Sequence, residues 1–258
     1  MRDVTKRKEA FRKSVIGERH VNNQGYSFTI IEYYNKLNCT IQFDDGGILH
    51  NVNRDSLKTS SINNPNHPYL CGIGYIGIGL YSTKVNGKTT TTYTRWANMI
   101  RRCYNKEYQE KYPSYKNVTV CDEWHNFQNF AQWFEKNYNP EYMEDWHVDK
   151  DILIKGNKIY SPETCCFVPR EVNNLFRTMC GKICIGTTFN KITNKFIAQV
   201  YMKGKKVCLG YFLKEEDAFQ DYKIAKEAYI KEVADKWKGL ISEQVYQAMY
   251  DYKIEKNE

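Results

Sequence analysis

The stretch that most constrains the fold runs from residue 146 to residue 174. Its first segment alternates polar and apolar residues, which predicts a strand with His147, Asp149 and Asp151 on one face. The Gly-Asn pair at 156–157 is typical of the turn between two paired strands, and a second extended segment follows it. The stretch therefore predicts a β-hairpin that carries three polar side chains on one face.

A helix is expected directly after this hairpin. Pro169 suits the first turn of a helix, and that helix would carry Asn173 and Asn174. Two strands and a short helix can bring carboxylate oxygens and an amide together around one hard cation such as Mg²⁺. The sequence thus predicts a ββα unit in which Asp149 and one of the two asparagines hold a divalent metal.

The chain is basic and rich in aromatic residues. It has 258 residues, 38 Lys and Arg against 30 Asp and Glu, and 41% hydrophobic residues, enough to fill the core of one large domain or of two to three small ones. A net charge of +8 favours a polyanionic partner, because neutralised phosphates release counterions. The alternative is a charged surface that only keeps the protein soluble.

No segment is apolar for long enough to span a bilayer, so no membrane partner is expected. The first twenty residues hold seven Lys and Arg residues without an apolar core, which argues against a signal peptide. We therefore expect a cytoplasmic protein whose nine cysteines are reduced thiols. Cys103, Cys121 and Cys165 could converge on a zinc ion, but buried apolar thiols explain them better, and a structural Zn²⁺ is not expected.

Residues 1–22 are predicted to form a basic arm, either a short helix or a loose segment. The rest of the N-terminal third is expected to be all-β. Strand-like segments lie between residues 25 and 81, with turns at 35–38 and 44–47. The pattern Gly-x-Gly-x-x-Gly at 72–77 matches a dinucleotide-binding fingerprint. That motif requires a helix immediately after it, whereas residues 78–81 read as a strand, so we expect no NAD site.

Two helices are predicted in the middle of the chain, and both are expected to support the ββα unit. The first would place four residues on one apolar stripe: Trp96, Met99, Ile100 and Cys103. The second, near residues 124–137, repeats the pattern with Phe127, Phe130 and Phe134.

The C-terminal part predicts three antiparallel strands with tight turns between residues 187 and 212, then an amphipathic helix. That helix would turn four residues toward the sheet: Ala218, Tyr222, Ala225 and Tyr229. Residues 236–258 read as a further helix that packs back onto this domain. Its apolar stripe would consist of Leu240, Ile241, Val245 and Met249.

Several motifs, taken together, resemble a phage-encoded family of HNH-type homing endonucleases. They are Trp96-Ala-Asn-Met99 with Arg102-Cys103-Tyr-Asn105, Val118-Thr-Val-Cys121-Asp-Glu-Trp124, Asp149-Lys150-Asp151, Tyr160-Ser161-Pro162-Glu163 and Asn173-Asn174. The resemblance covers roughly a third of the chain. It implies metal-dependent DNA cleavage and a small β-barrel module before the nuclease-like part.

The same resemblance assigns roles to individual residues. Asp149 would hold the metal, with Asn173 or Asn174 as a second ligand. HNH nucleases usually place a histidine beside the first acid to deprotonate the attacking water, but the neighbour here is Lys150. The catalytic candidates are therefore His147, Asp149 and Lys150.

The C-terminal domain resembles the three-strand-plus-helix DNA-binding domain of plant ethylene-response factors. The matching residues are Leu209-Gly210-Tyr211-Phe212, Glu216-Asp217-Ala218 and Tyr222. The resemblance implies that the exposed face of the sheet enters the major groove of DNA. The candidate contacts are Lys191, Lys195, Gln199, Tyr201, Lys203, Lys205 and Lys206. Few arginines lie on these strands, so phosphate contacts by lysine are expected more than paired bonds to guanine.

Together these patterns predict an α+β protein of four parts. These are a basic arm (1–22), a small β-barrel (23–84), a helix-supported HNH-like ββα module (85–180) and a three-stranded sheet with helices (181–258). The leading hypothesis is a phage-type protein that binds double-stranded DNA and retains metal-dependent cleavage. The alternatives are a catalytically inactive DNA-binding protein and a protein that inhibits a host defence factor.

Overall fold

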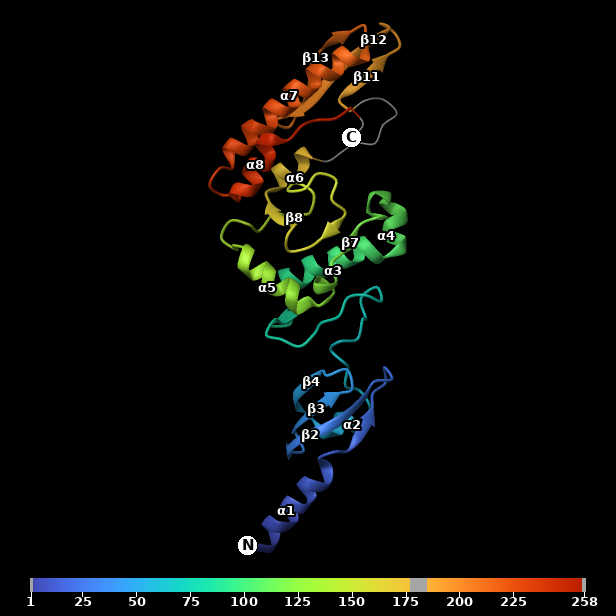
Figure 1. The fold of residues 1–258 in the computed structure, drawn as a ribbon, viewed down its shortest axis with the longest axis vertical. Coiled ribbons are helices and arrows are strands. Elements are labelled where there is room, and N and C mark those ends of the chain that lie inside the picture. The colour runs from blue at the N-terminus through green and yellow to red at the C-terminus, as the bar shows by residue number, and fades with distance from the viewer. Residues whose placement is uncertain (1, 177–184, 257–258) are drawn as a thin grey trace. The chain divides into compact units, whose positions relative to one another are not determined.

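Helices and strands are mixed along the whole chain, which makes the fold α+β as expected (Figure 1). The computed structural model describes residues 2–176 and 185–256, with side chains from residue 6 onward. Contacts divide the chain into two compact units, Met1–Lys136 and Asn137–Glu258. The boundary between these units falls inside residues 85–180, the segment predicted as one HNH-like module.

The N-terminal unit begins with a helix and an open sheet. Its elements are α1 (Arg2–Val15), β1 (Arg19–Val21), β2 (Ser27–Asn35), β3 (Asn38–Phe43), β4 (Ile48–Val52) and α2 (Arg54–Lys58). The strands pair antiparallel in the order β1-β2-β3-β4. Alternation along β2 buries Phe28 and Ile30, and residues from both helices, Val15 and Leu57, pack into the same core.

The small barrel expected here does not form. In the part of the chain that the structure describes, β1 pairs only with β2 and β4 pairs only with β3, so the sheet stays open. Val15 of α1 and Leu57 of α2 pack into the core of this open sheet. The residues 1–22 read as an arm therefore contain a helix and the first strand, and the side chain of Val15 is fully buried.

The glycine-rich segment at 72–79 is an irregular loop and not a nucleotide-binding turn. No helix follows Gly77, and the strand expected at residues 78–81 is also absent from this described segment. Gly77 has φ +71°, and a Cβ there would come within 2.1 Å of Asn126 Oδ1. The buried Gln128 amide holds the end of the loop through hydrogen bonds with the backbone N–H and C=O of Tyr81. The glycines thus permit close packing against two amide side chains.

Short strands and helices complete this unit. They are β5 (Lys84–Val85), β6 (Lys88–Thr89), α3 (Thr91–Tyr104), α4 (Lys106–Lys111), η1 (Pro113–Tyr115), β7 (Thr119–Val120), η2 (Asp122–His125) and α5 (Phe127–Asn137). The predicted stripe on α3 is confirmed, because its four residues are all buried. Thr90 caps α3 by accepting a hydrogen bond from the Tyr93 N–H, and Phe127, Phe130 and Phe134 of α5 are buried as expected.

The second unit starts with a ββα arrangement, but its strands pair differently from the prediction. Its elements are β8 (His147–Asp149), β9 (Ile159–Tyr160), β10 (Cys166–Val168) and α6 (Arg170–Leu175). β8 pairs antiparallel with β10, and α6 packs against β8. The turn at Gly156 is present, with φ +78°, yet it lies in a loop and does not join two paired strands.

The cause of this difference lies at the end of β8. Asp149 Oδ1 accepts hydrogen bonds from the N–H groups of Asp151 and Ile152, which turns the chain immediately after the strand. Asp151 is therefore outside the strand and does not continue the face of His147 and Asp149.

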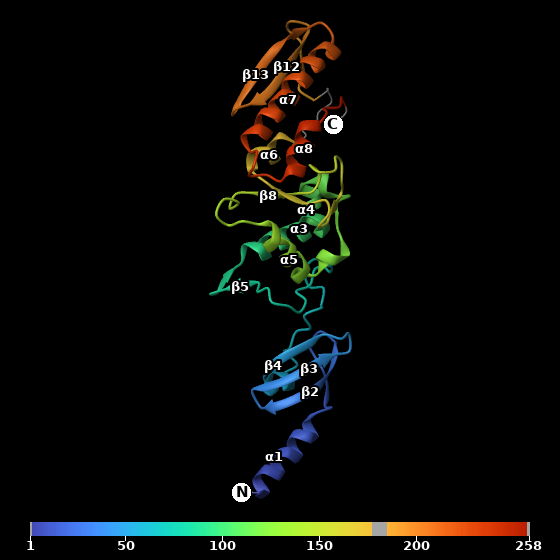
Figure 2. The same ribbon diagram turned by 60° about the vertical axis from the view of Figure 1, so that its left-hand side comes forward.

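The C-terminal part contains the three strands and the helix that were expected. They are β11 (Thr187–Asn190), β12 (Lys195–Met202), β13 (Lys205–Phe212) and α7 (Glu215–Lys236), and the strands pair antiparallel in that order. α7 lies along one face of the sheet (Figures 1 and 2). The sheet contributes Ala198 and Val200 to the interior, and α7 contributes seven buried residues, among them Ala218, Tyr222 and Tyr229.

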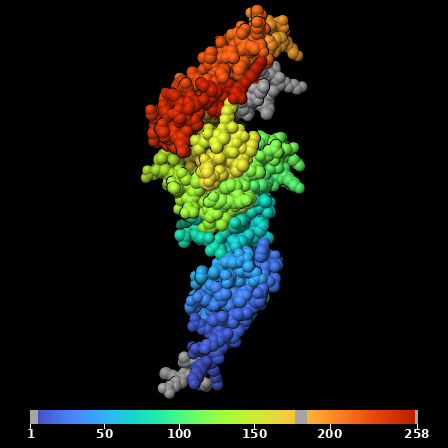
Figure 3. Space-filling view, viewed as in Figure 1, coloured from blue at the N-terminus to red at the C-terminus, as the bar shows by residue number. Residues whose placement is uncertain are grey.

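The last helix, α8 (Glu243–Asp251), packs on α7. Ile241, Val245 and Met249 are buried as expected, but Leu240 is 46% exposed because the chain turns at residues 237–242 before α8 begins. Asp235 accepts hydrogen bonds from two tyrosine hydroxyls of α8 at 2.8 Å each. The segment after α8 lies against α7 (red against orange in Figure 3), and its Ile254 N–H donates to Glu227 Oε1.

One side chain of α6 joins the ββα arrangement to the C-terminal end of α7. Glu171 Oε2 accepts hydrogen bonds from Lys236 Nζ at 2.5 Å and from the Trp237 indole N–H at 2.9 Å. These bonds hold the pKa of Glu171 below its ordinary value, although partial burial acts in the opposite direction.

Candidate functional site

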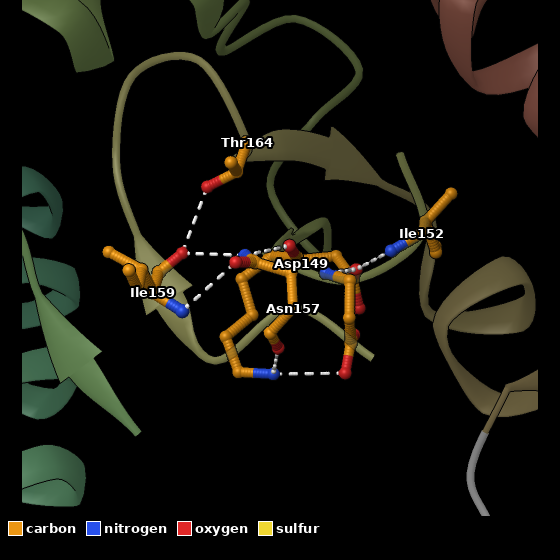
Figure 4. Close-up of polar contacts among 7 residues, drawn as sticks. Asp149, Ile152, Asn157, Ile159 and Thr164 are labelled. Atoms are coloured by element: carbon orange, nitrogen blue, oxygen red, sulfur yellow. Dashed lines mark hydrogen bonds and ion pairs between the residues drawn. The ribbon is translucent and has the colours of Figure 1, made fainter. Parts of the chain in front are cut away.

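The first candidate site lies on the ribbon formed by β8 and β10. The strand register places Asp149 opposite Cys166 and His147 opposite Val168. Asp149 and Cys166 therefore share one face of the ribbon, and Asp149 is buried, with 9% of its surface exposed. Figure 4 shows the surrounding polar contacts.

Burial determines the protonation behaviour of Asp149. Loss of hydration raises its pKa to about 6, and the negative charge of Asp151 acts in the same direction. The two backbone N–H groups bound to Oδ1 oppose this rise. Burial likewise raises the pKa of the Cys166 thiol, helped by the nearby Asp149 carboxylate. Asp149 thus takes up a proton at a pH where an exposed aspartate is ionised.

Lys150 lies within this cluster as a charge partner. Its Nζ donates to Asp151 Oδ2 and to the Asn157 carbonyl, both at 2.9 Å, and its side chain is only 9% exposed. An ammonium group that donates two hydrogen bonds cannot accept a proton at the same time. The Asn157 side-chain amide in turn donates to the carbonyls of Lys150 and Ile159, both at 2.7 Å, which fixes the loop that supplies the Asn157 carbonyl (Figure 4).

The predicted metal ligands are not joined by contacts. Asn173 is partly exposed and Asn174 is exposed on α6, and no hydrogen bond between either amide and Asp149 occurs among the described residues. Groups of three or more His, Cys, Asp or Glu side chains suited to a metal ion are likewise not found among the residues with a described position. Cys103 and Cys165 are buried and Cys121 is partly exposed.

The second candidate site is the sheet of β11, β12 and β13. Residues 185–214 contain no aspartate or glutamate and six lysines, at positions 191, 195, 203, 205, 206 and 214. α7, on the other side of the sheet, has seven acidic residues against four lysines. The two layers of this domain therefore carry opposite net charge.

The register identifies which residues lie on the sheet face opposite α7, hereafter the open face. β12 contributes Lys195, Ile197, Gln199 and Tyr201, whose side chains alternate with the buried Ala198 and Val200. Their partners on β13 are Tyr211, Cys208 and Lys206, and β11 adds Thr188 and Asn190. Tyr201 and Tyr211 are 65% and 57% exposed. The open face thus combines exposed aromatic rings with lysines.

Three predicted contacts lie elsewhere. Lys203 Nζ pairs with Glu232 Oε1 of α7 at 2.6 Å, so its side chain points to the helix side of the sheet, and this ion pair raises the Lys203 pKa. Lys205 lies opposite Met202, in register with the helix-covered face. Lys191 follows β11 in the turn before β12 and is exposed. Of the seven predicted residues, the open face therefore carries Lys195, Gln199, Tyr201 and Lys206.

The structure adds Tyr211 and Cys208 to this face. A register shift between Ala198 and Gln199 places Cys208, and not Leu209, opposite Gln199. Simple alternation along β13 does not reveal such a bulge, so the sequence alone did not place Cys208 and Tyr211 on this face.

Membrane insertion by a helix finds no support, since each helix within residues 2–176 and 185–256 is too short or too polar to cross a bilayer.

Comparison of the chain with protein-family models, with curated proteins and with solved structures finds no match.

Proposed function

We propose that this protein binds double-stranded DNA through the open face of its C-terminal sheet. The observation that carries the proposal is the charge of residues 185–214, which contain six lysines and no acidic residue; Lys195 and Lys206 of this segment lie on the open face, and the acidic helix α7 covers the other face. This asymmetry directs a polyanion to one face only. A small antiparallel sheet is also narrow enough to enter the major groove.

The chemistry of the open face favours contacts with the DNA backbone. The sequence has no arginine after position 177, so the domain lacks the guanidinium group, whose planar set of donors pairs best with guanine. Lys195 and Lys206 would neutralise phosphates, while Tyr201 and Tyr211 would pack against sugars and base edges. We therefore propose binding that depends strongly on salt and weakly on sequence.

Replacing both open-face lysines should weaken duplex binding in a measurable way. Each phosphate contact contributes about 0.9 to the slope of log K against log salt concentration. The double variant Lys195→Gln with Lys206→Gln is therefore expected to lower that slope by about 2. The measurement is fluorescence anisotropy of a labelled random duplex over a series of salt concentrations.

Lys203→Gln is the matched control. It removes a lysine from the same β12–β13 region, but one that pairs with Glu232 on the helix side. An unchanged slope is expected for this variant. Equal slopes for the double variant and the wild type, or no duplex binding at low salt, would contradict the proposal. Co-purification of a host protein in the absence of duplex binding would favour the defence-inhibitor alternative.

A second candidate function, metal-dependent DNA cleavage, is favoured by one observation in the ββα arrangement. His147 and Asp149 alternate with Val148 on β8 and so share one face, next to α6 with its two asparagines. In this proposal Asp149 would bind Mg²⁺ and His147 would take the proton of the attacking water. Lys150 would balance the carboxylate charge, since its ammonium is already bound by two acceptors.

The cleavage proposal predicts that Asp149→Asn abolishes Mg²⁺-dependent nicking of supercoiled plasmid. The amide oxygen can still accept the two backbone hydrogen bonds, so the turn after β8 should persist while the charge that binds the metal is lost. His147→Ala should reduce nicking as well, with duplex affinity unchanged in both variants. Nicking by Asp149→Asn at the wild-type rate would remove Asp149 from the mechanism.

A further inference from the structure

We propose that a second nucleic-acid site exists in the N-terminal unit, and that it binds a single strand. A groove of about 830 Å³ lies between α1 and the end of β2 with its following turn. Its lining includes four cationic and two exposed aromatic side chains: Lys8, Arg12, Lys13, Lys36, Phe11 and Tyr34. This site is separate from the open face and does not depend on the function proposed for it.

The charge of the groove selects an anionic partner. Glu9 is the one acidic residue among the lining residues that the structure describes, and it lies 3.6 Å from Lys13 Nζ. Lys36 pairs with Asp55 at 2.9 Å, but both side chains are at least half exposed, so a phosphate can compete for this lysine. The lining thus carries an excess of positive charge on both walls.

The aromatic residues distinguish among anionic partners. Phe11 is 49% exposed and Tyr34 is 55% exposed, so part of each ring is accessible to a ligand in the groove. The Arg12 guanidinium lies over the Tyr34 ring, 5.3 Å from its centroid. In proteins that bind single-stranded nucleic acids, aromatic rings and guanidinium groups stack on successive bases, and neighbouring basic side chains bind the phosphates.

Other polyanions would use only part of this surface. A duplex keeps its bases stacked inside the helix, and an acidic polypeptide has no planar apolar groups in register with its charges, so neither would cover the exposed parts of the two rings. The groove is also preformed. Val15 is fully buried at the end of α1, and Phe11 makes an edge-to-face contact with Tyr33 at 5.9 Å between centroids. The groove therefore needs little rearrangement to bind a single-stranded nucleic acid, which reduces the entropic cost of binding.

The test measures binding of the full chain to a labelled 15-nucleotide oligothymidylate and to a labelled duplex. Tyr34→Ala is expected to reduce affinity for the single strand about ten-fold, because stacking of one base on one ring is lost. Tyr34→Phe should retain the wild-type affinity. The double variant Arg12→Gln with Lys13→Gln should lower the salt slope for the single strand by about 1.4. Duplex affinity should change less than about two-fold in all of them.

Tyr112→Ala provides the matched aromatic control. Tyr112 is 41% exposed in the same unit and has the Lys111 ammonium over its ring, but it lies outside the groove, so single-strand affinity should not change. Equal losses of single-strand and duplex affinity in Tyr34→Ala would overturn the inference, and so would unchanged single-strand affinity. Competition by polyglutamate as effective as by unlabelled oligothymidylate would also overturn it. Wild-type protein that binds the single strand but no duplex would refute the function proposed for the open face and leave this site intact.

Discussion

Replacing Gly186 with alanine is expected to lower the free energy of unfolding of the C-terminal domain by about 4 kcal/mol. Gly186 has φ +76°, a conformation that costs an L-amino acid about 1 kcal/mol or more. The added Cβ would also lie 2.1 Å from two ring carbons of Tyr222. Tyr222 is buried between α7 and the sheet and cannot move away without disrupting the core. The measurement is urea unfolding followed by circular dichroism.

Gly204→Ala separates the two causes. Gly204 has nearly the same conformation, φ +75°, in the turn between β12 and β13, but among the described residues no neighbouring atom lies within 4 Å of the position of its Cβ. It should cost only about 1 kcal/mol, the conformational part of the effect. Similar losses in both variants would mean that the contact with Tyr222 is unimportant.

The contribution of Asp149 to stability is expected to fall as the pH rises from 4 to 7. Its pKa is about 6 in the folded protein against an ordinary value of 3.8. Between these values the folded state binds the proton more tightly than the unfolded state, so the contribution is present below pH 4 and is lost through pH 6. A difference of about 2 pKa units corresponds to about 3 kcal/mol.

The measurement compares the wild type with Asp149→Asn in urea at pH 4, 5, 6 and 7, with a chelator present to exclude metal binding. Asparagine does not titrate, so the stability difference between the two proteins isolates this one group. That difference should shift against the wild type by about 3 kcal/mol over the range. A constant difference would show that Asp149 is not perturbed. An opposite trend would mean that attraction by Lys150 outweighs burial.

Local periodicity was sufficient to predict most helices and strands. The 3.6-residue spacing of Trp96, Met99, Ile100 and Cys103 matches the buried side of α3, and the alternation in residues 187–212 matches the three C-terminal strands. Both signals depend only on neighbours in sequence. The barrel expected at residues 23–84 failed because closure depends on which edge strands meet, and this is not encoded in the spacing along any one strand.

The candidate sites were predictable only in part, for a similar reason. The Gly-Asn pair predicted that β8 would pair with the segment directly after the turn, but β8 pairs with β10. The reason is that Asp149 Oδ1 accepts two backbone hydrogen bonds and turns the chain immediately after β8. Lys203 was grouped with the open-face lysines because its charge is visible in the sequence, whereas its partner Glu232 lies on α7. Residue types can be read from a sequence, but the direction of a side chain in a turn depends on tertiary contacts.

The bonds from Glu171 to Lys236 and Trp237 have a consequence for any DNA held by the sheet. α7 supports the sheet along its length, and these bonds fasten its far end to the helix that follows β10. In the proposals above, a duplex seated on the open face would then lie at a constant distance from Asp149, so a cut would fall a set number of base pairs from the segment that the sheet holds.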